Sequence, residues 1–170
     1  LTLLEKSQLS PTEIDVIIVG TVTPDHFTPS TAAIVQNNIN AINAWGFDLS
    51  AACSGFIYGL ETGSSLIKSG NYNNVMVIGV DTMTSILDFQ DRDTCVIFGD
   101  GGGAVLLESS EDEDGIIDSI LKSDGIGLDY LHQKAGGSLH PPTHETIDKR
   151  MHYVFQEGKT VFKFAVTNMA

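Results

Sequence analysis

This chain is poor in basic residues and in long apolar segments. Of its 170 residues, 9 are Lys or Arg and 22 are Asp or Glu, which gives a formal net charge of −13. A protein that binds nucleic acid or an anionic membrane surface by charge needs a basic stripe, so we expect neither partner. The apolar runs also fall well short of the ~20 residues that a membrane-spanning helix needs.

Cysteine is scarce as well. Cys53 and Cys95 are the only two, they lie far apart, and no CxxC pair is present. This spacing argues against a disulfide framework and fits a reducing cytoplasm.

Motifs typical of metal or phosphate binding are incomplete. His140 and His144 have the spacing of a ligand pair on a helix, but the two prolines between them break that helix. The segment "DEDG" resembles a calcium loop, yet Ser110 and Leu121 stand where acidic ligands are required. The segment "GDGGGAV" lacks the Lys-Ser/Thr ending of a Walker loop, and Leu106 stands where GxGxxG needs Gly. We expect no metal site. We interpret these glycines as a tightly turned backbone segment with a structural role.

Strand and helix patterns alternate along the chain, which indicates an α/β fold with a mainly parallel sheet. Ser30 is a good N-cap for "TAAIVQNNI", and Gly70 ends a second helix that we predict from about Ala51 to Ser69. We expect residues 125–158 to be irregular and a last helix to start near Lys159. The predicted strands are "IDVIIVG", "AWGFDL", "NVMVIGV", a strand that begins near Gly103, and "GIIDSILKSDG".

Two features concern the limits of the folding units. The acidic run "ESSEDEDG", Glu108–Gly115, reads as a solvated connection and a boundary between two halves. The chain opens with "LTLLEKSQLSP", like the last turns of a helix, and closes with the amphipathic "GKTVFKFAVTNMA". We therefore expect a fragment of a longer chain, with frayed natural termini as the alternative.

The stretch "FDLSAACSGFIYG" places Cys53 at a turn from a strand into a helix. The first amides of a helix have no partner inside the helix, and the helix dipole favours negative charge there. A thiolate at this position is stabilised, and the backbone amide of Cys53 can donate a hydrogen bond to an oxyanion. The chemistry indicated is acyl transfer through a thioester on Cys53. The alternative is a buried structural cysteine, because free Cys packs as a small hydrophobe.

The segment "FDLSAACSGFIYGL" resembles the nucleophile segment of β-ketoacyl-acyl-carrier-protein synthase III, the condensing enzyme that starts bacterial fatty-acid synthesis. Further collinear matches extend the resemblance over essentially the whole chain. They are "VTPDHFTPSTAAIVQ", "QDRDTCVIFGDGGGAVLL", "SDG" and "VFKFAVTNMA". The "AACSGF" elbow followed by "DR…FGDGxGAV" separates this family from the elongating condensing enzymes.

The resemblance implies a thiolase-like α/β fold of two related halves in a homodimer, with layered, mainly parallel or mixed sheets and a buried helix. Residues 1–112 would form most of the first half, without its first segment, and residues 113–170 the start of the second. An acyl group would pass from coenzyme A to Cys53, and malonyl-acyl-carrier-protein would then be decarboxylated and condensed with it, without a cofactor.

The family's assisting His and Asn lie beyond Ala170, so we expect the fragment alone to be inactive. None of this chain's histidines sits in a matching motif, and none is given a catalytic role; they are His26, His132, His140, His144 and His152.

The resemblance also suggests substrate contacts. Arg92 in "QDRDT" matches the arginine that meets the nucleotide end of coenzyme A; the alternative is an ion pair with Asp91 or Asp93. Thr28, with Phe27 as a weaker candidate, matches a loop that reaches toward the partner subunit's acyl pocket; the alternative is a plain turn residue.

Two other functions stay open at this point. One is a condensing enzyme that uses coenzyme A substrates alone, similar to 3-hydroxy-3-methylglutaryl-coenzyme A synthase. The other is a non-catalytic subunit of a condensing enzyme.

Overall fold

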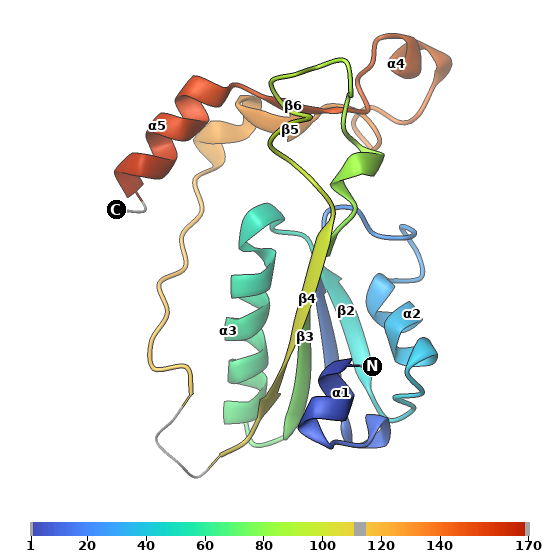
Figure 1. The fold of residues 1–170 in the computed structure, drawn as a ribbon, viewed down its shortest axis with the longest axis vertical. Helices are drawn as coiled ribbons and strands as arrows, with labels where there is room; N and C mark the ends of the chain where they lie inside the picture. The colour runs from blue at the N-terminus through green and yellow to red at the C-terminus, as the bar shows by residue number, and fades with distance from the viewer. Residues whose placement is uncertain (1, 111–114, 169–170) are drawn as a thin grey trace. The chain divides into compact units, whose positions relative to one another are not determined.

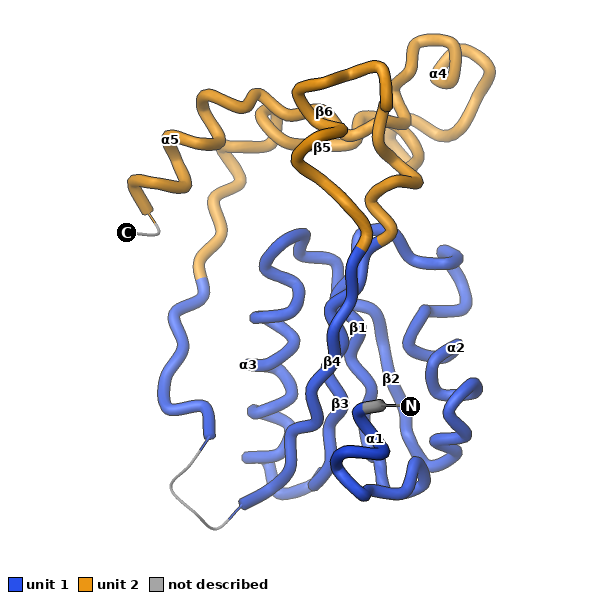
Figure 2. The backbone as a smooth tube through the Cα atoms, viewed as in Figure 1, with its two compact units in different colours: residues 1–81, 101–121 blue, residues 82–100, 122–170 orange. Residues whose placement is uncertain are grey.

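The computed structural model describes residues 2–110 and 115–168, which belong to two compact units (Figure 2). Unit 1 consists of residues 1–81 and 101–121, and unit 2 of residues 82–100 and 122–170. The units are therefore not consecutive halves of the sequence, because segment 82–100 belongs to unit 2. A boundary at residues 112–113, inside the acidic run, lies outside the described residues and stays a prediction.

Unit 1 is built on a four-stranded sheet with the strand order β2-β1-β3-β4 (Figure 1). β1 (Val16–Gly20) lies between β2 (Trp45–Leu49) and β3 (Asn74–Asp81) and runs parallel to both. β4 (Gly101–Glu108) pairs with β3 in the antiparallel direction. The predicted α/β class and mainly parallel sheet are confirmed.

Both faces of this sheet are covered, and β1 shows why. Its first four residues, Val16–Val19, are all fully buried. Ile17 and Val19 pack in one apolar cluster with Leu4 and Ala32, which come from α1 (Thr2–Ser7) and α2 (Thr31–Asn38). Val16 and Ile18 point to the other face and pack with Phe56 and Leu60 of the helix α3 (Gly55–Lys68). A strand buried on both faces is continuously apolar, as the sequence of β1 is.

The helix α3 lies unusually close to the sheet because the buried residues of the helix are glycines. Gly55, Gly59 and Gly63 follow the i, i+4, i+8 spacing of one helix face. A Cβ atom at Gly59 would lie 2.8 Å from Val77 Cγ1, and one at Gly63 2.9 Å from Leu107 Cδ1. The helix buries this face only, since Ile57 is 54% exposed. This face of α3 is the buried one in the described chain.

Unit 2 contains short elements joined by turns. Its two-stranded antiparallel sheet is formed by β5 (Leu131–Gln133) and β6 (Val154–Gln156). The helix α4 (His144–Asp148) lies between these strands in sequence, and α5 (Gly158–Asn168) follows them. Two 3-10 turns, Met83–Ser85 and Gly125–Asp129, complete the regular structure described in unit 2. In unit 1, the 3-10 turn Pro11–Glu13 precedes β1.

Two predictions about elements need correction. Residues 115–125 form no strand, because a strand needs a hydrogen-bonded neighbour and this segment has none among the described residues. Ile117 is 94% exposed as a result. The long helix begins at Gly55 and not near Ala51, since Ala51 and Ala52 have non-helical or left-handed backbone angles.

Candidate active site

Cys53 lies at the sharp connection between β2 and α3. β2 ends at Leu49, and a single 3-10 turn, Ala52–Ser54, leads into α3. Ala52 takes a left-handed backbone with φ of 46°, an uncommon conformation for a residue with a side chain. This reversal leaves Cys53 as an exposed free thiol. Within the described chain, Cys53 is therefore not packed as a buried structural cysteine.

The backbone around Cys53 is that of a helix start. Ser54 N–H donates to Ala51 O at 3.1 Å, and Gly55 N–H donates to Ala52 O. The Cys53 amide precedes both of these donors in the chain. It is therefore one of the first amides of the helical segment, for which no preceding turn supplies a carbonyl acceptor. An exposed sulfur beside such amides is suited to accept an acyl group and to stabilise the charge on its oxygen.

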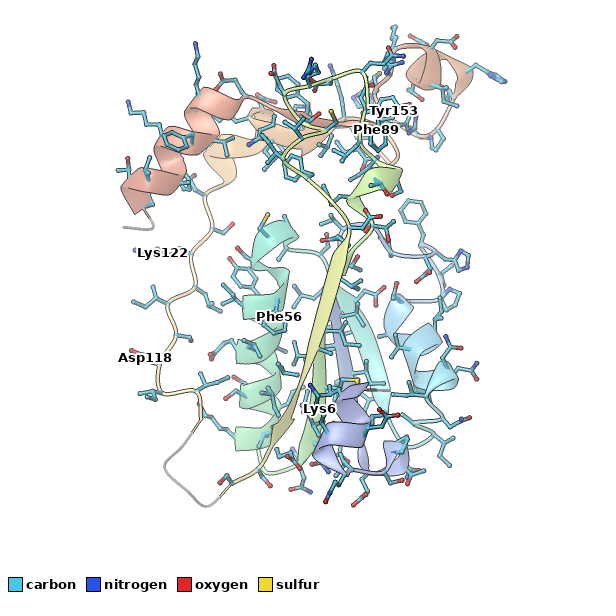
Figure 3. The ribbon with its side chains drawn as sticks, viewed as in Figure 1. Lys6, Phe56, Phe89, Asp118, Lys122 and Tyr153 are labelled. Carbon is cyan, nitrogen blue, oxygen red and sulfur yellow. The ribbon has the colours of Figure 1, made fainter. Side chains whose placement is uncertain are left out.

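Close packing beneath the elbow fixes its place on the sheet. A Cβ atom at Gly20, the last residue of β1, would lie 2.8 Å from the carbonyl carbon of Gly55. Thr21 N–H donates to Leu49 O at 3.2 Å and ties the ends of β1 and β2 together. Phe56, labelled in Figure 3, covers Gly79 of β3. The elbow is therefore held at the carboxyl edge of the parallel strands, where α/β sheets place their ligands.

Two carboxylates that the sequence analysis missed organise this edge. Asp48 of β2 accepts hydrogen bonds from Thr31 N–H at 2.7 Å and Ala32 N–H at 2.8 Å, which satisfies the start of α2. Asp81, at the end of β3, accepts from Val22 N–H at 2.8 Å in the loop after β1. The available signal was an acidic residue in an otherwise apolar strand, in "GFDL" and in "VIGVD".

Phe27 and Thr28 lie in that same loop of unit 1, between β1 and α2. The Phe27 side chain is 91% exposed, and Thr28 is exposed too. Ser30 ends the loop and caps α2 by accepting from Ala33 N–H at 3.2 Å, as predicted. The loop and the Cys53 elbow thus follow the carboxyl ends of neighbouring parallel strands.

Arg92 belongs to unit 2 and lies in a run of turns, where it is exposed. The Asp91 carboxylate is occupied by Asp93 N–H at 3.0 Å and by Thr94 Oγ1 at 2.8 Å. Within residues 2–110 and 115–168, Arg92 forms no ion pair. The alternative of an Arg92 pair with Asp91 or Asp93 is not observed, and the guanidinium is available to a ligand.

An ion pair in unit 2 joins Arg150 to Asp88, 62 positions apart in the sequence. The Arg150 side chain donates to the Asp88 carboxylate, and this hydrogen bond lowers the pKa of Asp88 below its ordinary value. The same bond raises the pKa of Arg150.

In the part of the chain that the structure describes, no three His, Cys, Asp or Glu side chains gather as metal ligands. His140 precedes α4, which begins at His144, so the two do not share a helix. No described helix is both long and apolar enough to cross a membrane.

Comparison with known proteins identifies relatives of this chain. The family model for 3-oxoacyl-[acyl-carrier-protein] synthase III matches residues 47–125, which include Cys53 and Arg92. The β-ketoacyl-[acyl-carrier-protein] synthase III of Chlorobaculum tepidum is 58% identical over 170 residues, covering 99% of this chain and 52% of the relative. That of Phocaeicola vulgatus is 51% identical over 168 residues, covering 99% and 50%.

Solved structures give the same result. The crystal structure of 3-oxoacyl-[acyl-carrier-protein] synthase III from Aquifex aeolicus matches with a TM-score of 0.86 and 40% identity, covering 98% of this chain and 49% of that one. The corresponding structure from Pseudomonas aeruginosa matches with a TM-score of 0.84 and 35% identity, covering 96% and 49%. The chain spans about half the length of the curated relatives it matches. Its fold is thiolase-like, and the chain belongs to the β-ketoacyl-[acyl-carrier-protein] synthase III family.

Proposed function

We propose that the protein containing this chain starts fatty-acid synthesis by two reactions at Cys53. In the first, the Cys53 thiolate attacks the carbonyl carbon of an acyl-coenzyme A, and the coenzyme A thiolate leaves. In the second, malonyl-acyl-carrier-protein loses carbon dioxide, and the resulting carbanion attacks the Cys53 thioester. The Cys53 thiolate leaves, and the product is a 3-oxoacyl-acyl-carrier-protein.

The observation that carries this proposal is the exposed Cys53 thiol at the start of α3. Small neighbours, Ala51, Ala52 and Ser54, leave room for an acyl group, and the Cys53 amide is the proposed oxyanion donor. In this proposal these groups serve the first reaction. The resemblance assigns the second to a His and an Asn that match no position up to Ala170, so we propose that turnover needs the full-length protein.

The remaining residues take substrate roles in this proposal. Arg92 contacts the nucleotide end of coenzyme A, for which an exposed planar guanidinium is suited by stacking or by pairing with phosphate. Phe27 and Thr28 line the acyl pocket of the partner subunit in a homodimer, which would cover the exposed Phe27 ring. Acyl-coenzyme A is a substrate, and no cofactor is required. The proposed compartment is the reducing cytoplasm, where Cys53 stays a free thiol.

The test is a condensation assay on the full-length protein, with labelled acetyl-coenzyme A and malonyl-acyl-carrier-protein. We expect labelled 3-oxoacyl-acyl-carrier-protein from the parent protein and from Cys95→Ser, and none from Cys53→Ala. Product that still forms in Cys53→Ala would contradict the proposal. Condensation with malonyl-coenzyme A that is as fast as with the carrier protein would instead favour the enzyme class that uses coenzyme A substrates alone.

A further inference from the structure

The segment that presents Arg92 has no helix or strand to hold its shape. Residues 86–97 form bends and turns, and acidic side chains fix them. Asp88 Oδ1 accepts from Gln90 N–H at 2.8 Å, and Asp91 N–H donates to Asp88 O at 2.9 Å. Asp91 then fixes the turn after Arg92 through the fully buried Thr94. The position of Arg92 therefore depends on Asp88 and Asp91, which set the turns on either side.

Asp88 is in turn held by Arg150, which is 62 positions away in the sequence. Arg150 Nε donates to Asp88 Oδ2 at 3.0 Å, and Arg150 Nη2 also pairs with this oxygen. Asp88 thus uses one carboxylate oxygen for the local turn and the other for Arg150. The Asp88 side chain is 16% exposed and the Arg150 side chain 46%, so water reaches this ion pair mainly from the Arg150 side.

The guanidinium of Arg150 is itself held in place. Its central carbon lies 5.0 Å from the centroid of the Tyr153 ring, within the range of a cation–π contact (Tyr153 is labelled in Figure 3). The Arg150 backbone is left-handed, with φ of 55°, which marks a position constrained by its surroundings. Val154 N–H donates to Ile86 O at 2.9 Å and makes a second tie between the same two segments.

We propose that Arg150 is a positioning residue for acyl-coenzyme A: by holding Asp88 in place, it fixes the turn that presents Arg92 to the nucleotide end of the substrate. The inference rests on the proposed function, because it needs Arg92 to contact coenzyme A. Arg150 acts through Asp88 and does not itself touch the substrate. Its loss therefore weakens acyl-coenzyme A binding and leaves the chemistry at Cys53 intact.

Lys149 offers a matched control. It carries the same charge, precedes Arg150 directly, and pairs with Glu145 on α4 at 2.6 Å. Both side chains of that pair are well exposed, at 63% and 74%, and neither contacts segment 86–97 in the contacts described. Replacing Lys149 changes the net charge as replacing Arg150 does, and it leaves the Asp88 contact in place.

The experiment measures kcat and the KM for acetyl-coenzyme A in the full-length protein, at saturating malonyl-acyl-carrier-protein. We expect Arg150→Gln to raise this KM about 3- to 10-fold, with kcat within about twofold of the parent. We expect Lys149→Gln to change neither. We expect Arg150→Lys to raise KM less than Arg150→Gln does, because the ammonium keeps the positive charge beside Asp88 although it cannot reproduce the planar fork. If Arg150→Gln does not fold, Asp88→Asn breaks the same pair from the other side and should raise KM in the same way.

A double-mutant cycle with Arg92→Gln separates this inference from the proposed function. If Arg150 acts through Arg92, adding Arg150→Gln to Arg92→Gln should raise KM no further. Multiplying effects, or an unchanged KM in both Arg150→Gln and Asp88→Asn, would overturn the inference while the role of Arg92 stands. If Arg92→Gln itself leaves KM unchanged, the proposed coenzyme A contact fails, and the role of Arg150 fails with it.

Discussion

The loop after β1 should depend on one carboxylate, that of Asp81. Asp81 Oδ1 accepts from Val22 N–H at 2.8 Å and from Thr23 N–H at 3.2 Å. The same oxygen accepts from the hydroxyls of Thr21 and Thr23, each at 3.0 Å. Asp81→Ala removes every one of these contacts and leaves the Val22 amide without its acceptor, whereas the Thr23 amide keeps the Thr21 hydroxyl at 3.1 Å.

The size of the effect follows from these contacts. A hydrogen bond to a charged group contributes about 1.5–3 kcal/mol, and an unpaired buried donor costs about 1–3 kcal/mol. The four contacts share one oxygen, and Asp81 is half-buried, so water can replace part of the loss. We expect Asp81→Ala to lower the free energy of unfolding by about 2–4 kcal/mol. Asp81→Asn keeps an acceptor oxygen at this position and should cost about 1 kcal/mol.

Urea-induced unfolding of the full-length protein measures this effect, as a lower midpoint with an unchanged m-value. Asp129→Ala is the control, because Asp129 is exposed, and we expect it to stay within about 0.5 kcal/mol of the parent. A loss below about 1 kcal/mol for Asp81→Ala, or a loss equal to that of Asp129→Ala, would refute the reasoning.

Three further changes test other parts of the account. Gly79→Ala places a Cβ 3.1 Å from Phe56 Cβ and should destabilise the protein by about 1–3 kcal/mol in urea, whereas Gly158→Ala, which meets no atom within 4 Å, should not. Thr28→Trp should shrink the acyl pocket, so the kcat/KM for butyryl- relative to acetyl-coenzyme A should fall about tenfold or more; an unchanged ratio would argue for a plain turn residue. The pKa of Glu157 is lowered by its hydrogen bonds from Thr160, so the carboxylate's contribution to stability is present above the ordinary pKa of 4.5 and is lost as pH falls below that value. Glu157→Gln should therefore flatten the acidic part of the curve of stability against pH. An unchanged curve would contradict the assignment.

The elements that the sequence predicts well are those set by local pattern. The apolar run of β1 required burial on two faces, and Ser30 could be recognised as a cap from its position before α2. The elbow at Cys53 was predicted as a turn into a helix. The left-handed backbone of Ala52 was not, because alanine carries no signal for that conformation.

The errors and omissions come from long-range contacts. Residues 115–125 have the composition of a strand, but composition does not supply a partner strand. The roles of Asp48 and Asp81 depend on loops that only the fold brings to them. The Asp88–Arg150 pair joins segments 62 positions apart, a separation that local sequence patterns do not encode.

The most direct measurement is peptide mapping by mass spectrometry after the full-length protein is mixed with acetyl-coenzyme A and no malonyl substrate. The account predicts an acetyl group on the peptide that contains Cys53, released by hydroxylamine as a thioester is, while the Cys95 peptide stays unmodified. An acetyl group bound at Cys95 or elsewhere while Cys53 stays a free thiol would contradict the claim that the thiol at the start of α3 is the acyl acceptor.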